Sequence, residues 1–322
     1  MKEVFIAGIG LTPVTRGQNR RPENLGADAV RSALTDAGVA AQHVNAVFVG
    51  NMTSGILSSQ LQLAALVAEQ SGLSGREAMT IEAACASGSA ALRTGFMSVA
   101  AGIHEAVIVC GTEQLAHADK GAATRALATA ADYQLESSRD ETFVSLNATL
   151  MRLYLERYGI ESDQLAGFAI TAHANAMTNP NAVFHKEIDK SDYCAARTVI
   201  EPLRLYDVSP ICDGAAAVVL ASGDMARQLA GQGPAVRIAA SSVATMPLAL
   251  ANRNDPLELT AVRDATDAAF SQAGINRDQI DLFEPHDAYT IMTALSHEAS
   301  GYASPGRGGE LADAAHTGLR GD

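Results

Sequence analysis

The sequence predicts an α/β fold built from two duplicated halves, with layered helices and mostly parallel sheets. Apolar segments of strand character alternate with helical segments through the first half of the chain. A similar order of elements begins again near residue 235. Alanine and glycine are abundant among the 322 residues and tryptophan is absent, which suits helices that pack closely on sheets.

The first half contains five apolar segments that we expect to be strands. They are Val4–Ile9, Val44–Val49, Met79–Ala83, Ala106–Cys110 and Asp213–Leu220. Helices are expected between them at Asn24–Ala37, at Gln60–Gln70 and from Cys85 to about Ala101, where a glycine follows. Because these strands are almost wholly apolar, the sheet should be buried by helices. Gly8 and Gly10 lack the third glycine of a dinucleotide-binding turn, so no nucleotide is expected there.

The segment His117–Leu205 interrupts this alternation. It is more polar than its surroundings and contains two expected helices, Asn147–Tyr158 and Leu165–Ala176. We interpret it as an insertion that lies over the edge of the sheet. Insertions of this length often contact substrate.

An internal repeat predicts the second half. Ala37-Gly38 precedes the strand at Val44–Val49, and Ala273-Gly274 precedes an apolar segment, Ile280–Phe283, at the same spacing. A strand at Val236–Ala239, after a loop at residues 231–234, should open this half, and a helix at Ala288–Ala299 should follow. The predicted domains are therefore residues 1–225, with the insertion at about 117–205, and residues 235–322.

Composition excludes several classes of function. The formal net charge of −13 argues against binding to nucleic acid. The four cysteines show no CxxC or Cys/His spacing, which argues against a disulfide framework or a zinc site and fits a reducing compartment. No apolar stretch reaches 18 residues. We expect a cytoplasmic globular protein without a bound metal or cofactor.

Cys85 lies where the predicted strand at Met79–Ala83 breaks into a helix. The positive end of a helix stabilises a thiolate, the nucleophilic form of cysteine. The small residues Ser87 and Gly88 would let a substrate approach closely. The alternative interpretation is a buried structural cysteine. Cys110 and Cys212 are expected to be core cysteines at strand positions, and Cys194, in the insertion, is expected to have no particular role.

Five short motifs occur in a fixed order. They are Glu82–Gly88, Cys110–Glu113, His173–Ala176 with Asn179-Pro180, Ser209–Ala215 and Glu284–Tyr289. On duplicated α/β halves, these motifs resemble the thiolase family, in its archaeal-type and sterol-carrier-like branch. The resemblance covers essentially the whole chain and implies a thiolase-like fold.

The resemblance implies an acetyl-CoA C-acetyltransferase or 3-ketoacyl-CoA thiolase, with the CoA thioester as substrate and no cofactor. Cys85 would form an acyl-enzyme, and His286 would help to form an oxyanion hole. A capping role beside Asp287 is the alternative for His286. The residues expected to contact substrate are Ser87, Gly88, His173, Asn175, Asp287 and Ala288. Four cations could hold the anionic end of CoA, although solvated surface charge is the favoured interpretation for each of them: Lys186, Lys190, Arg197 and Arg204.

One departure from the family pattern concerns the catalytic base. The family places this base in a Gly-His-Pro motif, which does not occur in residues 1–322, and His297 and His316 lie in other contexts. We therefore expect a second half that is truncated before this motif, and an activity that is impaired. The missing segment should include a central strand.

The resemblance also implies partners and leaves two other functions open. It implies a homodimer or tetramer, a zinc-ribbon/OB-fold partner protein and a condensing synthase. A ketoacyl-synthase-type condensing enzyme would share the fold, the cysteine and the Pro285-His286 pair. A degenerate copy would instead be an acyl-CoA-binding or scaffold subunit.

Overall fold

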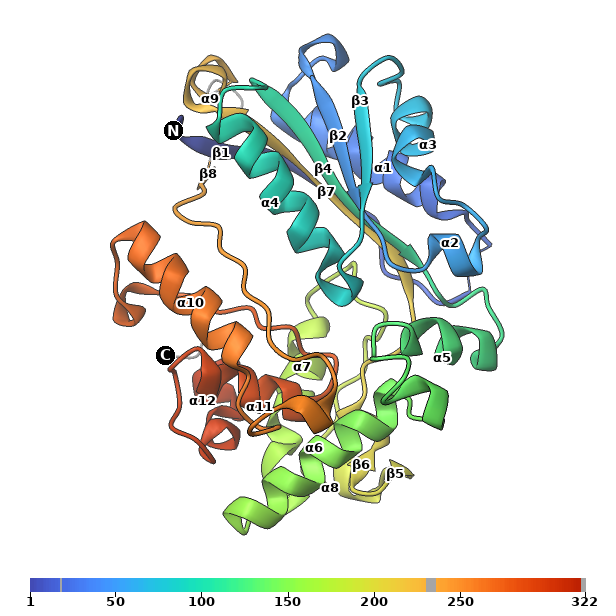
Figure 1. Ribbon diagram of the computed structural model, residues 1–322, viewed down its shortest axis with the longest axis vertical. Helices are drawn as coiled ribbons and strands as arrows, with labels where there is room; N and C mark the ends of the chain where they lie inside the picture. Colours follow the sequence, from blue (N-terminus) through green and yellow to red (C-terminus); the bar gives the residue numbers. More distant parts are fainter. Residues whose placement is uncertain (18, 230–235, 320–322) are drawn as a thin grey trace. The chain divides into compact units, whose positions relative to one another are not determined.

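A computed structural model describes residues 1–17, 19–229 and 236–319, and Figure 1 labels its elements. Contacts divide the chain into a first unit, residues 1–126 with 211–241, and a second unit, residues 127–210 with 242–322. Most of the segment expected as an insertion, residues 117–205, therefore belongs to the same unit as the C-terminal part of the chain. The loop predicted at residues 231–234 lies outside the described residues.

A six-stranded sheet in the order β3-β2-β4-β7-β1-β8 forms the centre of the first unit (Figure 1). Its strands are β1 (Val4–Leu11), β2 (Ala46–Gly50), β3 (Glu77–Ile81), β4 (Ala106–Gln114), β7 (Asp213–Ser222) and β8 (Val236–Arg237). β2 pairs in parallel with β3 and β4, whereas β7 is antiparallel to β4 and β1. Thus β1, β2, β3 and β4 run in one direction, which confirms the predicted α/β fold with a mostly parallel sheet.

Helices cover both faces of this sheet. The helices of the first unit are α1 (Pro22–Ala37), α2 (Ser54–Leu57), α3 (Leu63–Gln70), α4 (Ser87–Ala100) and α9 (Gly223–Leu229), and α5 (Lys120–Ala128) leads into the second unit. Val47 and Ile108 belong to the apolar core under α1 and α3. Phe48 and Val107 belong to the core under α4. This alternation of neighbouring residues between two cores produces the buried sheet that the apolar strands predicted.

Gly10 has a packing role. A Cβ atom at Gly10 would lie 2.0 Å from the carbonyl oxygen of Ala29 in α1. Glycine therefore allows α1 to lie directly on β1.

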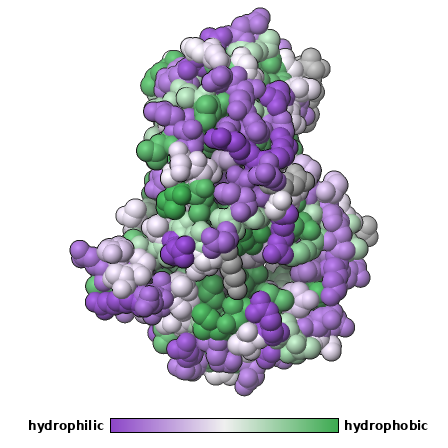
Figure 2. All heavy atoms as spheres, turned by 90° about the vertical axis from the view of Figure 1, so that its right-hand side faces the viewer, coloured by the Kyte–Doolittle hydropathy of each residue, from purple (hydrophilic) through white to green (hydrophobic). Residues whose placement is uncertain are grey.

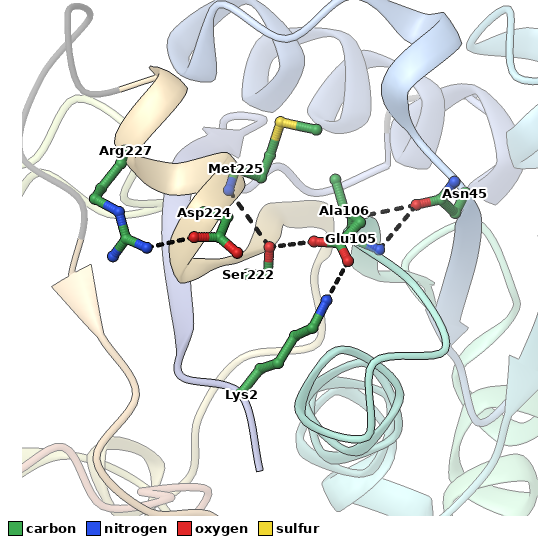
Figure 3. A network of polar contacts seen from close by, with 8 residues as sticks. All are labelled: Lys2, Asn45, Glu105, Ala106, Ser222, Asp224, Met225 and Arg227. Atoms are coloured by element: carbon green, nitrogen blue, oxygen red, sulfur yellow. Dashed lines mark hydrogen bonds and ion pairs between the residues drawn. The ribbon is translucent and has the colours of Figure 1, made fainter.

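A polar network joins strand ends at the edge of the sheet where β2 and β4 begin (Figure 3). The Lys2 ammonium pairs with Glu105, and the Ser222 hydroxyl donates a hydrogen bond to the same carboxylate. The Asn45 side-chain oxygen accepts hydrogen bonds from the backbone N–H groups of Glu105, at 3.1 Å, and Ala106, at 3.2 Å. The hydrogen bond from Lys2, with that from Ser222, lowers the pKa of Glu105.

The second unit is mainly helical. Its helices are α6 (Phe143–Tyr158), α7 (Ala166–Ala176), α8 (Lys190–Ala195), α10 (Thr260–Ala273), α11 (Thr290–Ala299) and α12 (Ala314–Thr317), and β5 (Thr198–Ile200) pairs with β6 (Leu203–Arg204). Met151 of α6, Phe168 of α7 and Leu295 of α11 share one apolar core. The helices predicted at 147–158, 165–176 and 288–299 are confirmed. Within the described ranges, no helix is both long enough and apolar enough to cross a membrane.

The repeat is confirmed in its helices but not in its strands. α1 and α10 both end at a glycine in the left-handed region, Gly38 with φ 61° and Gly274 with φ 69°, and a short 3-10 turn follows each. The strand predicted at Ile280–Phe283 is wrong, since this segment is irregular and its Leu282 is 74% exposed. The strand that begins at Val236 pairs with β1 of the first unit. A strand needs neighbours to satisfy its backbone, and the described part of the second unit supplies none to 280–283.

Large apolar side chains remain exposed in both units. Ile56, Leu61 and Ile103 are examples in the first unit, and Tyr133 and Leu248 are examples in the second. Figure 2 shows hydrophobic residues among hydrophilic ones on one face of the molecule. Exposed apolar residues that are scattered in this way are common on proteins and do not by themselves mark a binding site.

Candidate active site

Cys85 occupies a sharp turn between β3 and α4. The residues Ala84–Ala86 form a single 3-10 turn, and Ala84 has a φ of 48°, in the left-handed region that side chains disfavour. This conformation takes the chain from strand to helix within a few residues and leaves Cys85 exposed. The predicted strand-to-helix break at Cys85 is confirmed. We call residues 82–87 the Cys85 turn.

Ser87 holds the Cys85 turn together. Its hydroxyl accepts a hydrogen bond of 2.9 Å from the N–H of Ala83 and donates one of 2.6 Å to the carbonyl oxygen of Ala84. The Glu82 carboxylate accepts a further hydrogen bond, at 2.5 Å, from the N–H of Ala84. Ser87 is buried, and both hydrogen bonds of its hydroxyl are to backbone atoms of the turn. The structure therefore gives Ser87, which was expected to contact substrate, a role in shaping the Cys85 turn.

Two glycines define the space around the start of α4. A Cβ atom at Gly50, the last residue of β2, would lie 2.5 Å from the carbonyl oxygen of Ser87 and 2.6 Å from the nitrogen of Gly88. Glycine at this position thus lets α4 start directly on the end of β2. A Cβ atom at Gly88 itself would meet no described atom within 4 Å. The described residues therefore leave open space beside Gly88.

A polar cluster lies at the same edge of the sheet as Cys85. Glu113, near the end of β4, accepts hydrogen bonds from the Asn51 side chain at 2.9 Å, the Met52 N–H at 2.9 Å and the Thr53 hydroxyl at 2.5 Å. Asn51 also donates to the carbonyl oxygen of Thr112 at 2.7 Å. Because β2, β3 and β4 are parallel, their carboxyl ends meet at one edge, where ligands commonly bind in α/β proteins.

Sequence patterns alone assigned no role to Asn51 or Glu113. A usable signal was present, since both are polar residues at the carboxyl ends of predicted parallel strands. What the pattern could not show is that three donors from one loop converge on a single carboxylate.

The protonation state of Cys85 corrects one prediction. Burial raises the pKa of the Cys85 thiol, and the negative charge of Glu113 raises it further, against an opposing backbone hydrogen bond. The net shift of this pKa is therefore opposite to the one expected from the helix end alone. Although part of Cys85 is exposed, its surroundings remove enough water to favour the neutral thiol. A reaction at Cys85 consequently needs a proton acceptor.

The other cysteines do not share this setting. Cys110 is buried in β4, and burial raises its pKa to about 12, which confirms its structural role. Cys212 precedes β7 and is half-buried, with its pKa raised by burial. Cys194 is exposed on α8 in the second unit.

His286 lies in the irregular segment that precedes α11. It is exposed, and the segment is anchored immediately after it. The carbonyl oxygen of Ala288 accepts a 3.0 Å hydrogen bond from the N–H of Ser209, and Val208 and Tyr289 form an isolated β-bridge. The structure thus places His286 at the loop-to-helix junction that the sequence predicted.

A buried carboxylate secures this junction. Asp207 accepts hydrogen bonds from the Thr290 hydroxyl at 2.6 Å, the Tyr193 hydroxyl at 2.7 Å and the Arg204 N–H at 2.7 Å. Burial raises the pKa of Asp207, and these three donors oppose that shift. Asp207 therefore connects α8 to the start of α11 and holds the end of the His286 segment in place.

His173 and Asn175 lie on α7 of the second unit. The His173 Nδ1 atom is 2.7 Å from the carbonyl oxygen of Lys186. Its ring stacks on Phe184, with centroids 6.0 Å apart, and meets Tyr206 edge-on at 5.5 Å. These contacts fix the orientation of the His173 ring within the second unit.

His297 lies on a helix, as the sequence indicated, whereas His316, expected in a polar tail, lies in the short helix α12. His297 is buried in α11, stacks on Phe168 at 5.6 Å and meets Phe283 at 5.5 Å. Burial lowers its pKa. His316 lies 2.7 Å from the Asp313 carboxylate.

The predicted site residues form three groups in the structure. Cys85, Ser87 and Gly88 lie together at the Cys85 turn of the first unit. His286, Asp287 and Ala288 are adjacent in the second unit, and His173 and Asn175 lie on α7. Of the candidate CoA-binding cations, Lys190 pairs with Asp163 at 2.9 Å and Arg204 donates to the carbonyl oxygen of Cys194 at 2.7 Å.

Comparison with known proteins identifies two family models in this chain. The model described as "Thiolase, N-terminal domain" matches residues 4–224, and "Thiolase C-terminal domain-like" matches residues 242–322. The expected truncation of the second half finds no support in these matches.

Two archaeal proteins and one solved structure are similar to the chain. An acetyl-CoA acetyltransferase of Methanothermobacter thermautotrophicus is 36% identical over all of this chain and 83% of its own length. An acetyl-CoA acetyltransferase of Methanocaldococcus jannaschii is 32% identical over 97% of this chain and 79% of its own length. A solved structure of an "Ltp2-ChsH2(DUF35) aldolase" shares the fold, with a TM-score of 0.79 at 22% identity over 96% of this chain and 80% of its own.

Proposed function

Because this chain belongs to the thiolase family, we propose that it is an acyltransferase that forms or cleaves a carbon–carbon bond between acyl-CoA thioesters, with Cys85 as its nucleophile. The observation that carries the proposal is the position of Cys85, an exposed thiol on a sharp turn between a parallel strand and a helix. The archaeal relatives are named acetyl-CoA acetyltransferases, which supports acetyl-CoA as the acyl donor.

The first half-reaction is acyl transfer to Cys85. The thiol gives its proton to a base, and the sulfur attacks the carbonyl carbon of the thioester. The bond between that carbon and the CoA sulfur then breaks, and the CoA thiolate takes up a proton. The positive end of α4, which begins two residues after Cys85, favours the negative charge that develops at this centre.

The second half-reaction forms the carbon–carbon bond. A base removes an α-proton from a second acetyl-CoA, and the carbanion attacks the acyl group and displaces the Cys85 sulfur. We assign to His286 the donation of a hydrogen bond to the enolate oxygen. Its exposure and its anchored position before α11 support this role.

Turnover of acetoacetyl-CoA with CoA tests the complete reaction. Acetylation of Cys85 without any such turnover would refute the proposed carbon–carbon bond chemistry.

The test of the nucleophile is intact-protein mass after incubation with acetyl-CoA. We expect the wild type to gain one acetyl group and Cys85→Ala to gain none. Cys194→Ala is the matched control, because Cys194 is also exposed but lies in the second unit. An acetyl group on Cys85→Ala, or none on folded wild type, would refute Cys85 as the nucleophile.

The matches do not favour the ketoacyl-synthase alternative. Dependence on a malonyl thioester would restore it. A binding or scaffold subunit would instead hold acyl-CoA tightly without acetylation, and this binding would survive Cys85→Ala.

We also propose self-association, as a homodimer or tetramer, and association with a zinc-ribbon/OB-fold partner and a condensing synthase. β3 is an edge strand with β2 as its only neighbour in the described sheet, and such an edge can pair with a second copy. The structural neighbour is named for two components, Ltp2 and ChsH2(DUF35). Light scattering on the purified chain, alone and with candidate partners, tests these states.

A further inference from the structure

We propose that Glu113 is a positioning residue for the Cys85 nucleophile, one that fixes the loop after β2 and places a negative charge beside the thiol. The proposal rests on the proposed role of Cys85. It assigns to Glu113 no contact with the substrate. Its two parts, the fixed loop and the adjacent charge, stand on separate observations.

The fixed loop follows from three hydrogen bonds to one carboxylate. Asn51, Met52 and Thr53 are consecutive, and each donates to Glu113, at 2.9, 2.9 and 2.5 Å. Within the loop, the Asn51 side-chain oxygen accepts from the N–H of Ser54 at 2.8 Å. Hydrogen bonds to a carboxylate are stronger than those between neutral groups, so this loop has a single well-defined path.

The loop adjoins the Cys85 turn. The N–H of Asn51 donates to the carbonyl oxygen of Ile81, the last residue of β3, at 3.2 Å. Gly50, the preceding residue, lies against the backbone of Ser87 and Gly88. The path of the loop therefore borders the turn that presents the thiol.

Strand geometry places the Glu113 side chain on the same side of the sheet as the start of α4. A Cβ atom at Gly111 would point toward α4, 3.9 Å from the Cα of Gly88. Side chains two residues apart on a strand share a face, so Glu113 points to this side as well. In agreement with this placement, the charge of Glu113 raises the pKa of Cys85.

Other charged groups on the elements around Cys85 are engaged elsewhere. Glu82, after β3, accepts the hydrogen bond from the N–H of Ala84. Arg93, on α4, donates to the carbonyl oxygen of Ser241. Glu77 lies at the opposite end of β3, where it faces His104 at 3.4 Å. Burial is the main cause of the raised pKa of Cys85, and Glu113 is the charged residue of this region that adds to it.

The experiment measures the rate of Cys85 alkylation by iodoacetamide as a function of pH, by intact mass. Glu113→Gln removes the charge and keeps the size of the side chain. We expect its alkylation at neutral pH to be about two- to fivefold faster than in the wild type, with the profile moved to lower pH. Glu105→Gln is the matched control, because it removes a carboxylate at the opposite edge of the same sheet. We expect its profile to coincide with that of the wild type.

Thr53→Val separates the loop from the charge. It deletes one of the three donors and keeps the carboxylate, so we expect slower acetylation by acetyl-CoA and an unchanged alkylation profile. If circular dichroism shows that Glu113→Gln does not fold, Glu113→Asp takes its place. Its side chain is one methylene shorter, so the carboxylate lies farther from the thiol, and the alkylation profile should move to lower pH by a smaller amount.

A wild-type profile for folded Glu113→Gln, or for Glu113→Asp in its place, overturns the proposal. A wild-type acetylation rate for Thr53→Val overturns its positioning part. Alkylation needs no CoA chemistry. Absence of an acetyl adduct in the wild type would therefore refute the proposed function, whereas a shifted alkylation profile would still support the effect of Glu113 on the thiol.

Discussion

The Thr290 hydroxyl donates a 2.6 Å hydrogen bond to the buried carboxylate of Asp207, 83 positions earlier in the chain. The next residue pairs extend this contact, because Val208 bridges to Tyr289 and the N–H of Ser209 donates to the carbonyl oxygen of Ala288. Two segments distant in sequence are thus joined over three successive pairs. The joint lies immediately after His286, so it limits the positions that this side chain can adopt.

Replacing Thr290 with valine should destabilise the second unit. The change deletes one of three donors to a buried carboxylate and should lower the free energy of unfolding by about 1–3 kcal/mol. Thr290→Ser retains the hydroxyl and should stay within about 0.5 kcal/mol of the wild type. Urea denaturation followed by circular dichroism measures both variants. Equal midpoints for Thr290→Val and the wild type would show that the hydrogen bond contributes nothing.

Removing the Ser87 hydroxyl should loosen the Cys85 turn. Ser87→Ala leaves the N–H of Ala83 without its acceptor and deletes the bond to the carbonyl oxygen of Ala84. We expect a loss of about 1–2 kcal/mol in stability and slower acetylation of Cys85. Ser89→Ala, on the exposed side of the same helical turn, is the control and should behave as the wild type in stability. Unchanged stability and acetylation in Ser87→Ala would contradict the role of this hydroxyl.

A methyl group at Gly50 should not be accommodated. The added carbon would lie 2.5 Å from the carbonyl oxygen of Ser87, a backbone atom that moves only if α4 moves. Gly50→Ala should therefore cost about 1–3 kcal/mol, as is usual for overpacking. Gly88→Ala adds the same methyl group to open space and should leave the melting temperature nearly unchanged. Similar thermal unfolding of the two variants would argue against the close contact between β2 and α4.

The buried His297 should make stability depend on pH. Its pKa is lowered by burial, so the unfolded chain binds a proton more readily than the folded one. Stability is then fully present above the unfolded-state pKa, about 6.5, and is lost as pH falls below it toward the lowered folded-state pKa. His297→Gln should flatten this part of the stability profile, measured by urea denaturation between neutral and mildly acidic pH. If the stability of His297→Gln falls with pH as much as that of the wild type, other titratable groups cause the pH dependence.

Several elements could be predicted because their signals are local. The strand-to-helix break at Cys85 follows from an apolar run that meets a series of small residues, and the ends of α1 and α10 follow from glycines that adopt positive φ. The motifs around Cys85 and His286 were sufficient to indicate the family that the comparisons identify. None of these inferences needs knowledge of which distant segments meet.

The pairing of strands and the pKa of Cys85 depend on contacts between distant segments of the chain. Residues 280–283 have the composition of a strand, yet a strand forms only beside a partner, and β8 pairs instead with β1 of the first unit. The thiol of Cys85 is at a helix end, but burial and a carboxylate from β4 decide its pKa. The sequence by itself determined the local turns, caps and apolar faces. Only the tertiary structure decided strand pairing, desolvation and charge proximity, because these depend on atoms brought together from distant parts of the chain.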